Sequence, residues 1–149
     1  MRAHALVEPA FYRHAVIKVR ATAVLAALVI LAVALGIRLM PGSGGILDGS
    51  GAFAQNSGTA LYASMIYAGV FVLVPAARPV TAGIAAIGFC WAVELFQLTG
   101  VPEHLSERSL IARLVLGAHY DSADMLWYPI GVIPLVAIHH VLRTRRRSS

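Results

Sequence analysis

Charged side chains are scarce in this sequence, and their scarcity excludes an ordinary water-soluble domain. Asp, Glu, Lys and Arg make up only 13% of the 149 residues, whereas 58% are hydrophobic, and the mean hydropathy is +0.75. So few charged residues could not cover the surface of a globule in water. Cysteine is scarcer still: Cys90 is the only one, so no intrachain disulfide can form. We therefore interpret the chain as a membrane protein.

Motifs of common hydrolases and metal sites are also missing. The sequence has no paired His and Glu at metal-ligand spacing, no Gly-x-Ser-x-Gly and no Gly-Asp aspartyl signature. His139 and His140 lack a third ligand at matching spacing, so we interpret them as interfacial residues. His104 and His119 bracket a loop without any pattern that makes them a site. We expect no metal and no cofactor.

Four apolar blocks have the length of a membrane-spanning helix. A hydrocarbon core about 30 Å thick is crossed by roughly 20 helical residues, and runs of this length are too long for strands. The blocks cover residues 21–40, 58–77, 80–100 and 123–142. We predict an all-α fold in which residues 1–149 form a single membrane domain, a bundle of four transmembrane helices.

The segments between the blocks have the composition of connections. Residues 41–58 are dense in Gly and Ser, which predicts a flexible loop, and residues 75–80 contain two prolines, which predicts a short turn. In residues 101–121, Ser106 can cap the start of a short helix and Gly117 can end it. We expect this helix to be interfacial or re-entrant. One face of it is apolar, formed by Leu110, Ile111, Leu114 and Val115.

Positive charge is distributed unevenly between the two sides of the predicted bundle. Nine of the twelve Lys and Arg residues fall in the N-terminal segment, the 75–80 turn and the tail at 143–149, and three fall on the other side. Since positive residues are retained in the cytoplasm, we expect a multi-pass protein of the bacterial plasma (inner) membrane with both termini cytoplasmic. We interpret the basic tail as an orientation signal that also contacts anionic lipid, and expect no binding of nucleic acid.

Glu94 is the only charged residue between Pro79 and Gly100, inside the third block. If that helix runs outward, Glu94 lies roughly 9 Å below its outer end, with Gln97 on the same face and Trp91 one turn deeper. An unpaired carboxylate is costly there. We therefore expect a loop arginine or the acidic start of the fourth helix to complete a polar pocket that faces the bundle interior.

Asp121 and Asp124 repeat the three-residue spacing of Glu94 and Gln97, at the start of the fourth block. Arginines lie in the loop between the two pairs. The candidate ligand-binding residues are therefore Glu94, Gln97, Arg108, Arg113, Asp121 and Asp124. The sequence assigns no catalytic residue.

The same residues have purely structural interpretations. Glu94 and Gln97 can be interhelical hydrogen-bonding groups, and Asp121 and Asp124 are typical helix caps. Other residues are expected to have packing or interfacial roles only. They are Tyr62, Trp91, Trp127 and Tyr128, together with the small residues Ala82, Gly83, Ala86 and Gly88 of the third block.

Residues 58–135 resemble a known family. "VELFQL" (93–98) is followed by an arginine-bearing loop, "RLVLG" (113–117), an aromatic residue, an acid and "YPIG" (128–131). This order resembles the VanZ-like superfamily, and most closely its short bacterial branch of unknown function, the DUF2809-like integral membrane proteins. The resemblance places the family's Glu, Gln, loop Arg, Gly, acid and helix-four Gly on Glu94, Gln97, Arg108, Gly117, Asp124 and Gly131.

The chain also departs from that branch. Where the branch has Gly-Asp, this chain has Gly58 and Thr59, and two of the branch's tryptophans are replaced by Tyr62 and Ser122. The resemblance implies a role in the cell envelope, because the superfamily's namesake is associated with low-level teicoplanin resistance at the outer face of the membrane. It does not name a reaction.

Three classes of function remain open. In the first, which we favour, the outward pocket binds a polyprenyl-linked, other lipid-linked or anionic envelope ligand, and Arg108 and Arg113 hold its phosphate or carboxylate. In the second, an intramembrane hydrolase or transferase uses Glu94 as a general base. In the third, Glu94 relays protons in a subunit of an oligomeric transporter. Membrane lipids are expected contacts in every case, and a homo-oligomer or a membrane partner protein remains open.

Overall fold

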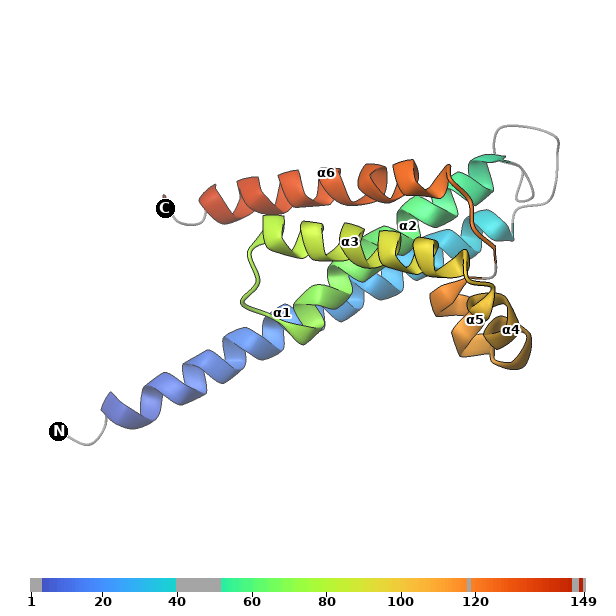
Figure 1. Ribbon diagram of the computed structural model, residues 1–149. Coiled ribbons are helices and arrows are strands. Elements are labelled where there is room, and N and C mark those ends of the chain that lie inside the picture. Colours follow the sequence, from blue (N-terminus) through green and yellow to red (C-terminus); the bar gives the residue numbers. More distant parts are fainter. Residues whose placement is uncertain (1–3, 40–51, 118, 146–147, 149) are drawn as a thin grey trace.

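The fold is a helical bundle, seen in a computed structural model that describes residues 4–39, 52–117, 119–145 and 148. Within these ranges helices are the only regular elements, which confirms the predicted all-α class (Figure 1). The helices are α1 (His4–Arg38), α2 (Ala52–Leu73), α3 (Pro79–Gln97), α4 (Val101–Arg108), α5 (Leu110–Leu116) and α6 (Asp124–Arg145).

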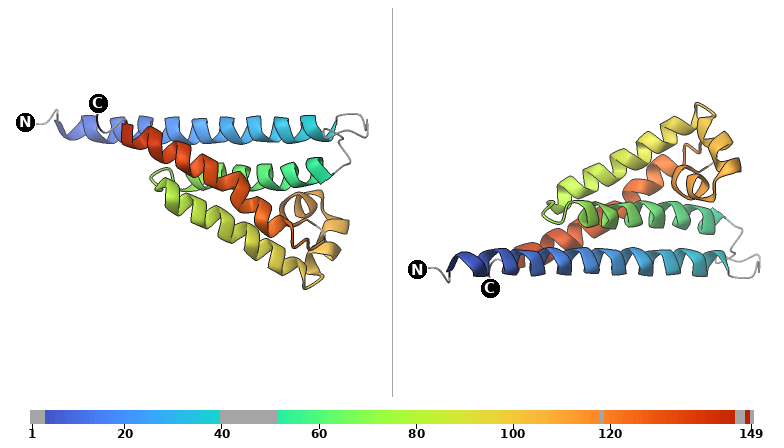
Figure 2. Two further views of the ribbon diagram at one scale, coloured as in Figure 1. Left: turned by 90° about the horizontal axis from the view of Figure 1, so that it is seen from above. Right: turned by 90° about the horizontal axis from the view of Figure 1, so that it is seen from below.

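Four long helices run back and forth, and two short helices lie together at one end (Figure 1). α2 occupies the middle, because it packs against α1, α3 and α6, while α3 and α6 also pack against each other. α4 and α5 pack on one another and contact α3. The start of α1 and the end of α6 lie toward the end of the bundle opposite α4 and α5 (Figures 1 and 2).

Three of these helices are long and apolar enough to cross a membrane, which indicates a multi-pass membrane protein. They are Tyr12–Ile37 within α1, all of α3 and all of α6. Their positions match the predicted spans at 21–40, 80–100 and 123–142. The predicted span at 58–77 corresponds largely to α2, which is 22 residues long but is not among the three. Polar and small residues in its first turns, such as Asn56 and Ser57, lower its hydropathy.

Part of the predicted loop at 41–58 is helical. Helix α2 already begins at Ala52, so the last seven residues of that segment are helical. Residues 41–51 lie outside the described residues. Gly and Ser weaken a helix only modestly, and here they are outweighed by tertiary contacts that begin at Gln55.

The predicted single helix in residues 101–121 is two helices. Gly100 takes a left-handed backbone (φ 73°) and Pro102 occupies the first turn, so α4 starts earlier than expected. Ser106 therefore lies inside α4 and does not cap it; its hydroxyl donates to the Gly117 carbonyl over 2.6 Å. Gly117 follows the last residue of α5 with φ 66°, as a helix-ending glycine should.

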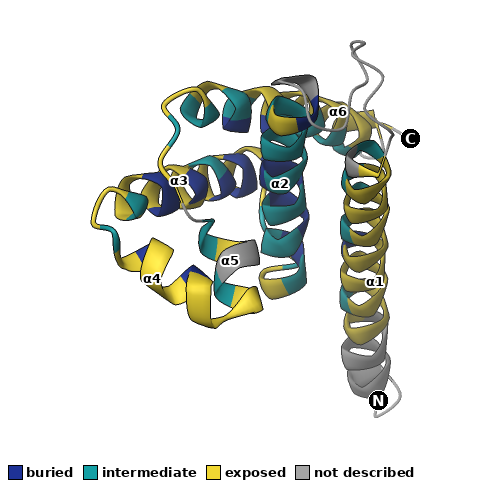
Figure 3. Cartoon of the chain, turned by 90° about the vertical axis from the view of Figure 1, so that its right-hand side faces the viewer, coloured by how far each residue is buried: buried dark blue, intermediate teal, exposed yellow. Residues whose placement is uncertain are grey.

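The core lies where α2, α3 and α6 meet (Figure 3). Small residues let these helices approach closely: a Cβ on Gly83 would lie 2.5 Å from Cγ2 of Val136, and one on Gly131 would overlap the Ala60 backbone. Gly88, by contrast, has no neighbour within 4 Å of such an atom. The buried core cluster consists of Ala23 from α1 together with Ala63, Tyr67, Phe71, Ala82, Ala86, Cys90, Tyr128 and Val132.

α1 is attached through one face only. Among the described residues it packs solely against α2, and Ala23 and Ala27 are on the less exposed side (Figure 3). Its large side chains, such as Leu25 and Leu28, are exposed. A contiguous apolar surface of this extent is unusual on a soluble monomer and is suited to contact with lipid.

Candidate functional site

Glu94 is fully buried, with 0% of its surface exposed, and both of its carboxylate oxygens accept hydrogen bonds. Oε1 accepts from the backbone N–H of Asp121 over 2.6 Å, and Oε2 accepts from the Tyr128 hydroxyl over 2.7 Å. These bonds compensate for the loss of water around the carboxylate. They also join α3 to the loop before α6 and to the first turns of α6.

The two aspartates face α2. Asp121 accepts from the Gln55 side-chain amide at Oδ2 (3.1 Å) and from the Ala123 backbone N–H at Oδ1 (2.9 Å), an Asx turn that leads into α6. Asp124 accepts from the Thr59 hydroxyl over 2.8 Å. Thr59 therefore places a hydrogen-bond donor beside the Asp124 carboxylate.

Gln97 connects α3 to the end of α5. Its Nε2 donates to the Leu116 carbonyl over 2.6 Å, and because a carbonyl can only accept, this bond fixes which end of the amide is nitrogen. Its Oε1 is buried and has no hydrogen-bond partner among the described residues. A Cβ on Gly117 would lie 2.7 Å from Nε2 of Gln97. A larger residue at position 117 would therefore displace the Gln97 amide from the Leu116 carbonyl, in addition to the strain from the positive φ.

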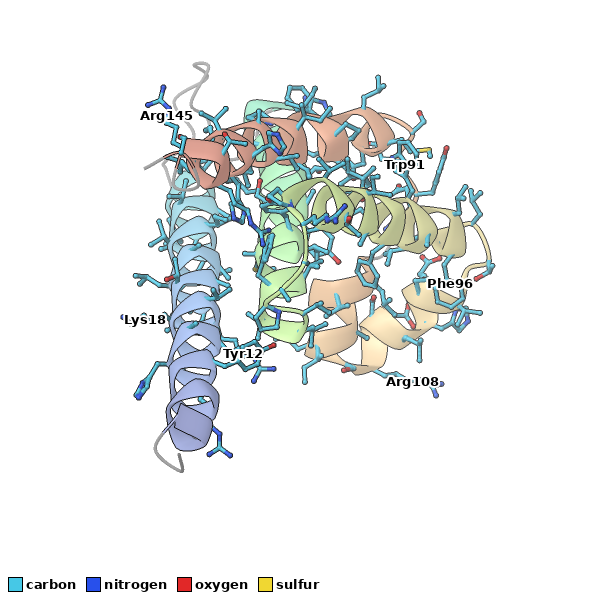
Figure 4. All side chains as sticks on the ribbon, turned by 90° about the vertical axis from the view of Figure 1, so that its left-hand side faces the viewer. Tyr12, Lys18, Trp91, Phe96, Arg108 and Arg145 are labelled. Carbon is cyan, nitrogen blue, oxygen red and sulfur yellow. The ribbon has the colours of Figure 1, made fainter. Side chains whose placement is uncertain are left out.

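Two more side chains complete these connections. The Tyr62 hydroxyl donates to the Val115 carbonyl over 2.7 Å, and the Trp91 indole N–H donates to the Met125 carbonyl over 3.0 Å. Trp91 thus lies between α3 and α6 (Figure 4). We call the side chains that meet here the Glu94 network: Gln55, Thr59, Tyr62, Glu94, Gln97, Asp121, Asp124 and Tyr128.

The α2 members of this network were not among the predicted site residues. Gln55, Thr59 and Tyr62 are spaced four and three residues apart, so they lie on one face of a helix. That spacing is the signal that could have found them. It was hidden because Gln55 falls in residues 41–58, which have the composition of a loop, whereas Thr59 and Tyr62 fall in the predicted span.

The arginines of the candidate site are placed differently. Arg108 is exposed at the last turn of α4, directed away from the bundle (Figure 4), and has no ion pair or hydrogen bond among the described residues. Arg113 belongs to α5, and its side chain is outside the described part of the chain. The structure therefore brings Glu94, Gln97 and the two aspartates together and leaves Arg108 apart from them. Of the two expected alternatives, a loop arginine and the acidic start of the fourth helix, the second lies beside Glu94. The donors there are the Asp121 backbone amide and the Tyr128 phenol.

The part of the chain that holds the Glu94 network defines its family. A family model described as "Protein of unknown function (DUF2809)" matches residues 49–132, which is more than half of the chain. The chain belongs to the DUF2809 family. All members of the Glu94 network lie inside the matched segment. No curated protein and no solved structure matches the chain.

The histidines of this DUF2809 protein have separate surroundings. His119 lies 3.5 Å from Glu103 in an exposed pair, the kind of surface contact that contributes little to stability. Nδ1 of His139 lies 3.0 Å from the Tyr67 hydroxyl, and its ring packs against Phe71, so His139 is in contact with the core rather than only at an interface. His140 is exposed. Within the described ranges, no group of three or more His, Cys, Asp or Glu could hold a metal ion.

Proposed function

We propose that this DUF2809 protein spans the bacterial plasma membrane four times, with α2 as the second span and both termini in the cytoplasm. The antiparallel order of α1, α2, α3 and α6 supports this topology, because an even number of crossings returns the chain to its starting side (Figure 1). This topology also places nine of the twelve Lys and Arg residues on the cytoplasmic side, where positive residues are retained. α4 and α5 then form an interfacial or re-entrant cap at the outer face.

We also propose that the family belongs to the VanZ-like superfamily. The proposal rests on the order of "VELFQL", "RLVLG" and "YPIG" along the chain. The first and last of these motifs meet through the hydrogen bond from Tyr128 to Glu94, and Gln97 of the first contacts Leu116 of the second. The three motifs therefore lie in contact with one another in the fold.

The function that we propose is recognition of the headgroup of a lipid-linked or anionic envelope ligand at the α4–α5 end. The observation that carries it is the buried Oε1 of Gln97, which has no donor among the described residues. A buried acceptor without a donor costs about 1–3 kcal/mol. A hydroxyl or amino group of a bound headgroup would remove that cost.

Arg108 supplies the second half of the proposed recognition. Its guanidinium is exposed on the same cap and without an ionic partner among the described residues, so it is available for a phosphate or carboxylate. The carboxylates of the Glu94 network would repel an anion. The acidic part of the ligand is therefore expected beside Arg108, and its hydroxyl or amino groups beside Gln97.

The geometry favours a positioning role for Glu94 over catalysis. A general base must reach the proton that it removes, directly or through one water. Glu94 is 0% exposed, and each of its oxygens already accepts a hydrogen bond from the protein. Its carboxylate holds the loop that follows Gly117 in place and so shapes the cap.

Native mass spectrometry of the full chain, with added polyprenyl phosphate, tests the proposal. Arg108→Ala and Gln97→Met should each lose most of the adduct that the wild type retains. Glu107→Gln is the matched control, because Glu107 is exposed on the same helix as Arg108, and it should retain the adduct. Equal retention by all four proteins, or no adduct on the wild type, would refute the binding site.

A further inference from the structure

A groove opens at the end of the bundle opposite α4 and α5. It has a volume of 660 Å³ and lies where the connection between α2 and α3 meets the last turns of α6. Part of its wall is apolar, formed by Ala76, Pro79 and Val80. The polar part of the wall consists of Arg78, Thr81, His140, Arg143 and Thr144.

The cations of this groove have no acidic neighbours among the described side chains. Five of the seven Asp and Glu residues have described side chains, and all five lie toward the α4–α5 end. They are Glu94, Glu103, Glu107, Asp121 and Asp124. The groove therefore has a positive potential that no described carboxylate cancels.

Arg143 is held in position at the groove. One N–H of its guanidinium, at Nη1, donates to the Ala77 carbonyl over 2.9 Å, which fixes the side chain across the α2–α3 connection. A guanidinium has five N–H groups, so others remain for an anion. Arg78 is exposed on the facing wall, with no hydrogen bond or ion pair among the described residues. The start of α3 at Pro79 adds the positive end of a helix dipole.

We propose that this groove binds the phosphate of an anionic phospholipid headgroup, such as that of phosphatidylglycerol. Arg78 and Arg143 contact the phosphate, and the apolar wall contacts the glycerol and upper acyl region. A lipid is a better fit than free phosphate because the groove lies at the ends of α3 and α6, two helices able to cross a membrane, and so opens at headgroup level. Basic pockets between membrane helices are known to select anionic headgroups.

This site is independent of the one proposed at the α4–α5 end. The two lie at opposite ends of the bundle and share no residue. Arg108→Ala should therefore leave phosphatidylglycerol binding unchanged, and substitutions in the groove should leave the polyprenyl phosphate adduct unchanged. Failure of one proposal does not affect the other.

The test is a titration of the purified full chain with phosphatidylglycerol and, separately, with phosphatidylcholine, followed by native mass spectrometry. Arg78→Gln combined with Arg143→Gln should weaken phosphatidylglycerol binding roughly thirtyfold and leave phosphatidylcholine unaffected. Arg13→Gln combined with Arg20→Gln is the matched control, because it removes the same charge from exposed positions on α1 outside the groove. Arg78→Gln alone should also weaken binding, and it removes no described hydrogen bond.

Two results would overturn the proposal. If both double variants weakened binding equally, attraction would depend on overall charge and not on the groove. If inorganic phosphate at millimolar concentration displaced phosphatidylglycerol from the wild type, the groove would be a site for free phosphate and not for a lipid. Retention of phosphatidylglycerol in the control, without displacement by phosphate, supports the lipid site.

Discussion

The Tyr128 hydroxyl donates a 2.7 Å hydrogen bond to the carboxylate of Glu94, and the two side chains are 4% and 0% exposed. The bond links the last turns of α3 to the first turns of α6. Because neither group is in contact with water, the carboxylate depends on this phenol and on the Asp121 amide for its hydrogen bonds. Four predictions concern this hydrogen bond, the contact at Gly131, the glycine at the end of α5 and the number of membrane crossings.

Tyr128→Phe should destabilise the protein by about 1–3 kcal/mol, because it leaves one oxygen of a buried carboxylate without its donor while keeping the ring in the core. Thermal unfolding in detergent measures the effect. Tyr12→Phe removes a hydroxyl from an exposed position on α1 and should change stability by less than about 0.5 kcal/mol. Equal melting temperatures for the two variants would contradict the prediction.

Gly131→Ala should destabilise the protein because its methyl group would overlap the Ala60 backbone, where α6 crosses α2. Forcing an extra carbon into a packed contact costs about 1–3 kcal/mol. Gly88→Ala is the control: the added carbon meets nothing within 4 Å, and alanine favours a helix interior by roughly 0.5–1 kcal/mol. Gly131→Ala should therefore lower the unfolding temperature and Gly88→Ala should raise it. If both variants shifted it in the same direction, α6 would not approach the Ala60 backbone of α2 as closely as the structure has it.

Gly117→Ala and Gly100→Ala separate backbone strain from crowding. Both glycines have positive φ, 66° and 73°, so both substitutions incur about 1–2 kcal/mol of strain. Only at Gly117 does the new carbon meet another group, Nε2 of Gln97 at 2.7 Å. Gly117→Ala should therefore be the more destabilising in thermal unfolding. If the two changes cost the same, the contact between Gln97 and the end of α5 is not maintained.

Cysteine labelling should decide whether α2 crosses the membrane. The native Cys90 is fully buried, so it should not react with an impermeant maleimide in the folded protein. If α2 spans, His4→Cys and Ser148→Cys should be protected together in intact cells, and His119→Cys should be labelled. With three crossings, the cysteines at positions 4 and 148 would behave oppositely. The cysteine at position 119 would then be labelled or protected in the same way as the cysteine at position 4.

Much of the helical frame was predictable because membrane-spanning runs carry their own signal. The boundaries of α3 and α6 agree with the apolar blocks at 80–100 and 123–142 within about three residues at each end. The start of α2 was missed because composition alone cannot register contacts made 65 and 66 residues away, those of Thr59 with Asp124 and Gln55 with Asp121.

Only part of the candidate site was predictable: Glu94, Gln97 and the two aspartates were found, but the α2 residues and the hydrogen bonds were not, and Arg108 lies apart. The spacing of Glu94 with Gln97 and of Asp121 with Asp124 correctly brought the two pairs to one region of the fold. The pocket was expected to be completed by a loop arginine or by the acidic start of the fourth helix. The structure has the second region beside Glu94, but the donor is the Asp121 backbone N–H and not a side chain. A backbone N–H is common to nearly all residue types, so the sequence does not mark it as a donor. The bond from Asp121 to Glu94 could therefore be found only in the structure.

Both donors to Glu94 come later in the chain than the carboxylate itself, by 27 and 34 residues. A ribosome therefore completes the third long helix before either partner has been made. Until the loop after Gly117 and the first turns of α6 emerge, the carboxylate has neither of these donors, and only water at the bilayer surface can take their place. The stable insertion of α3 is thereby made dependent on the synthesis of α6.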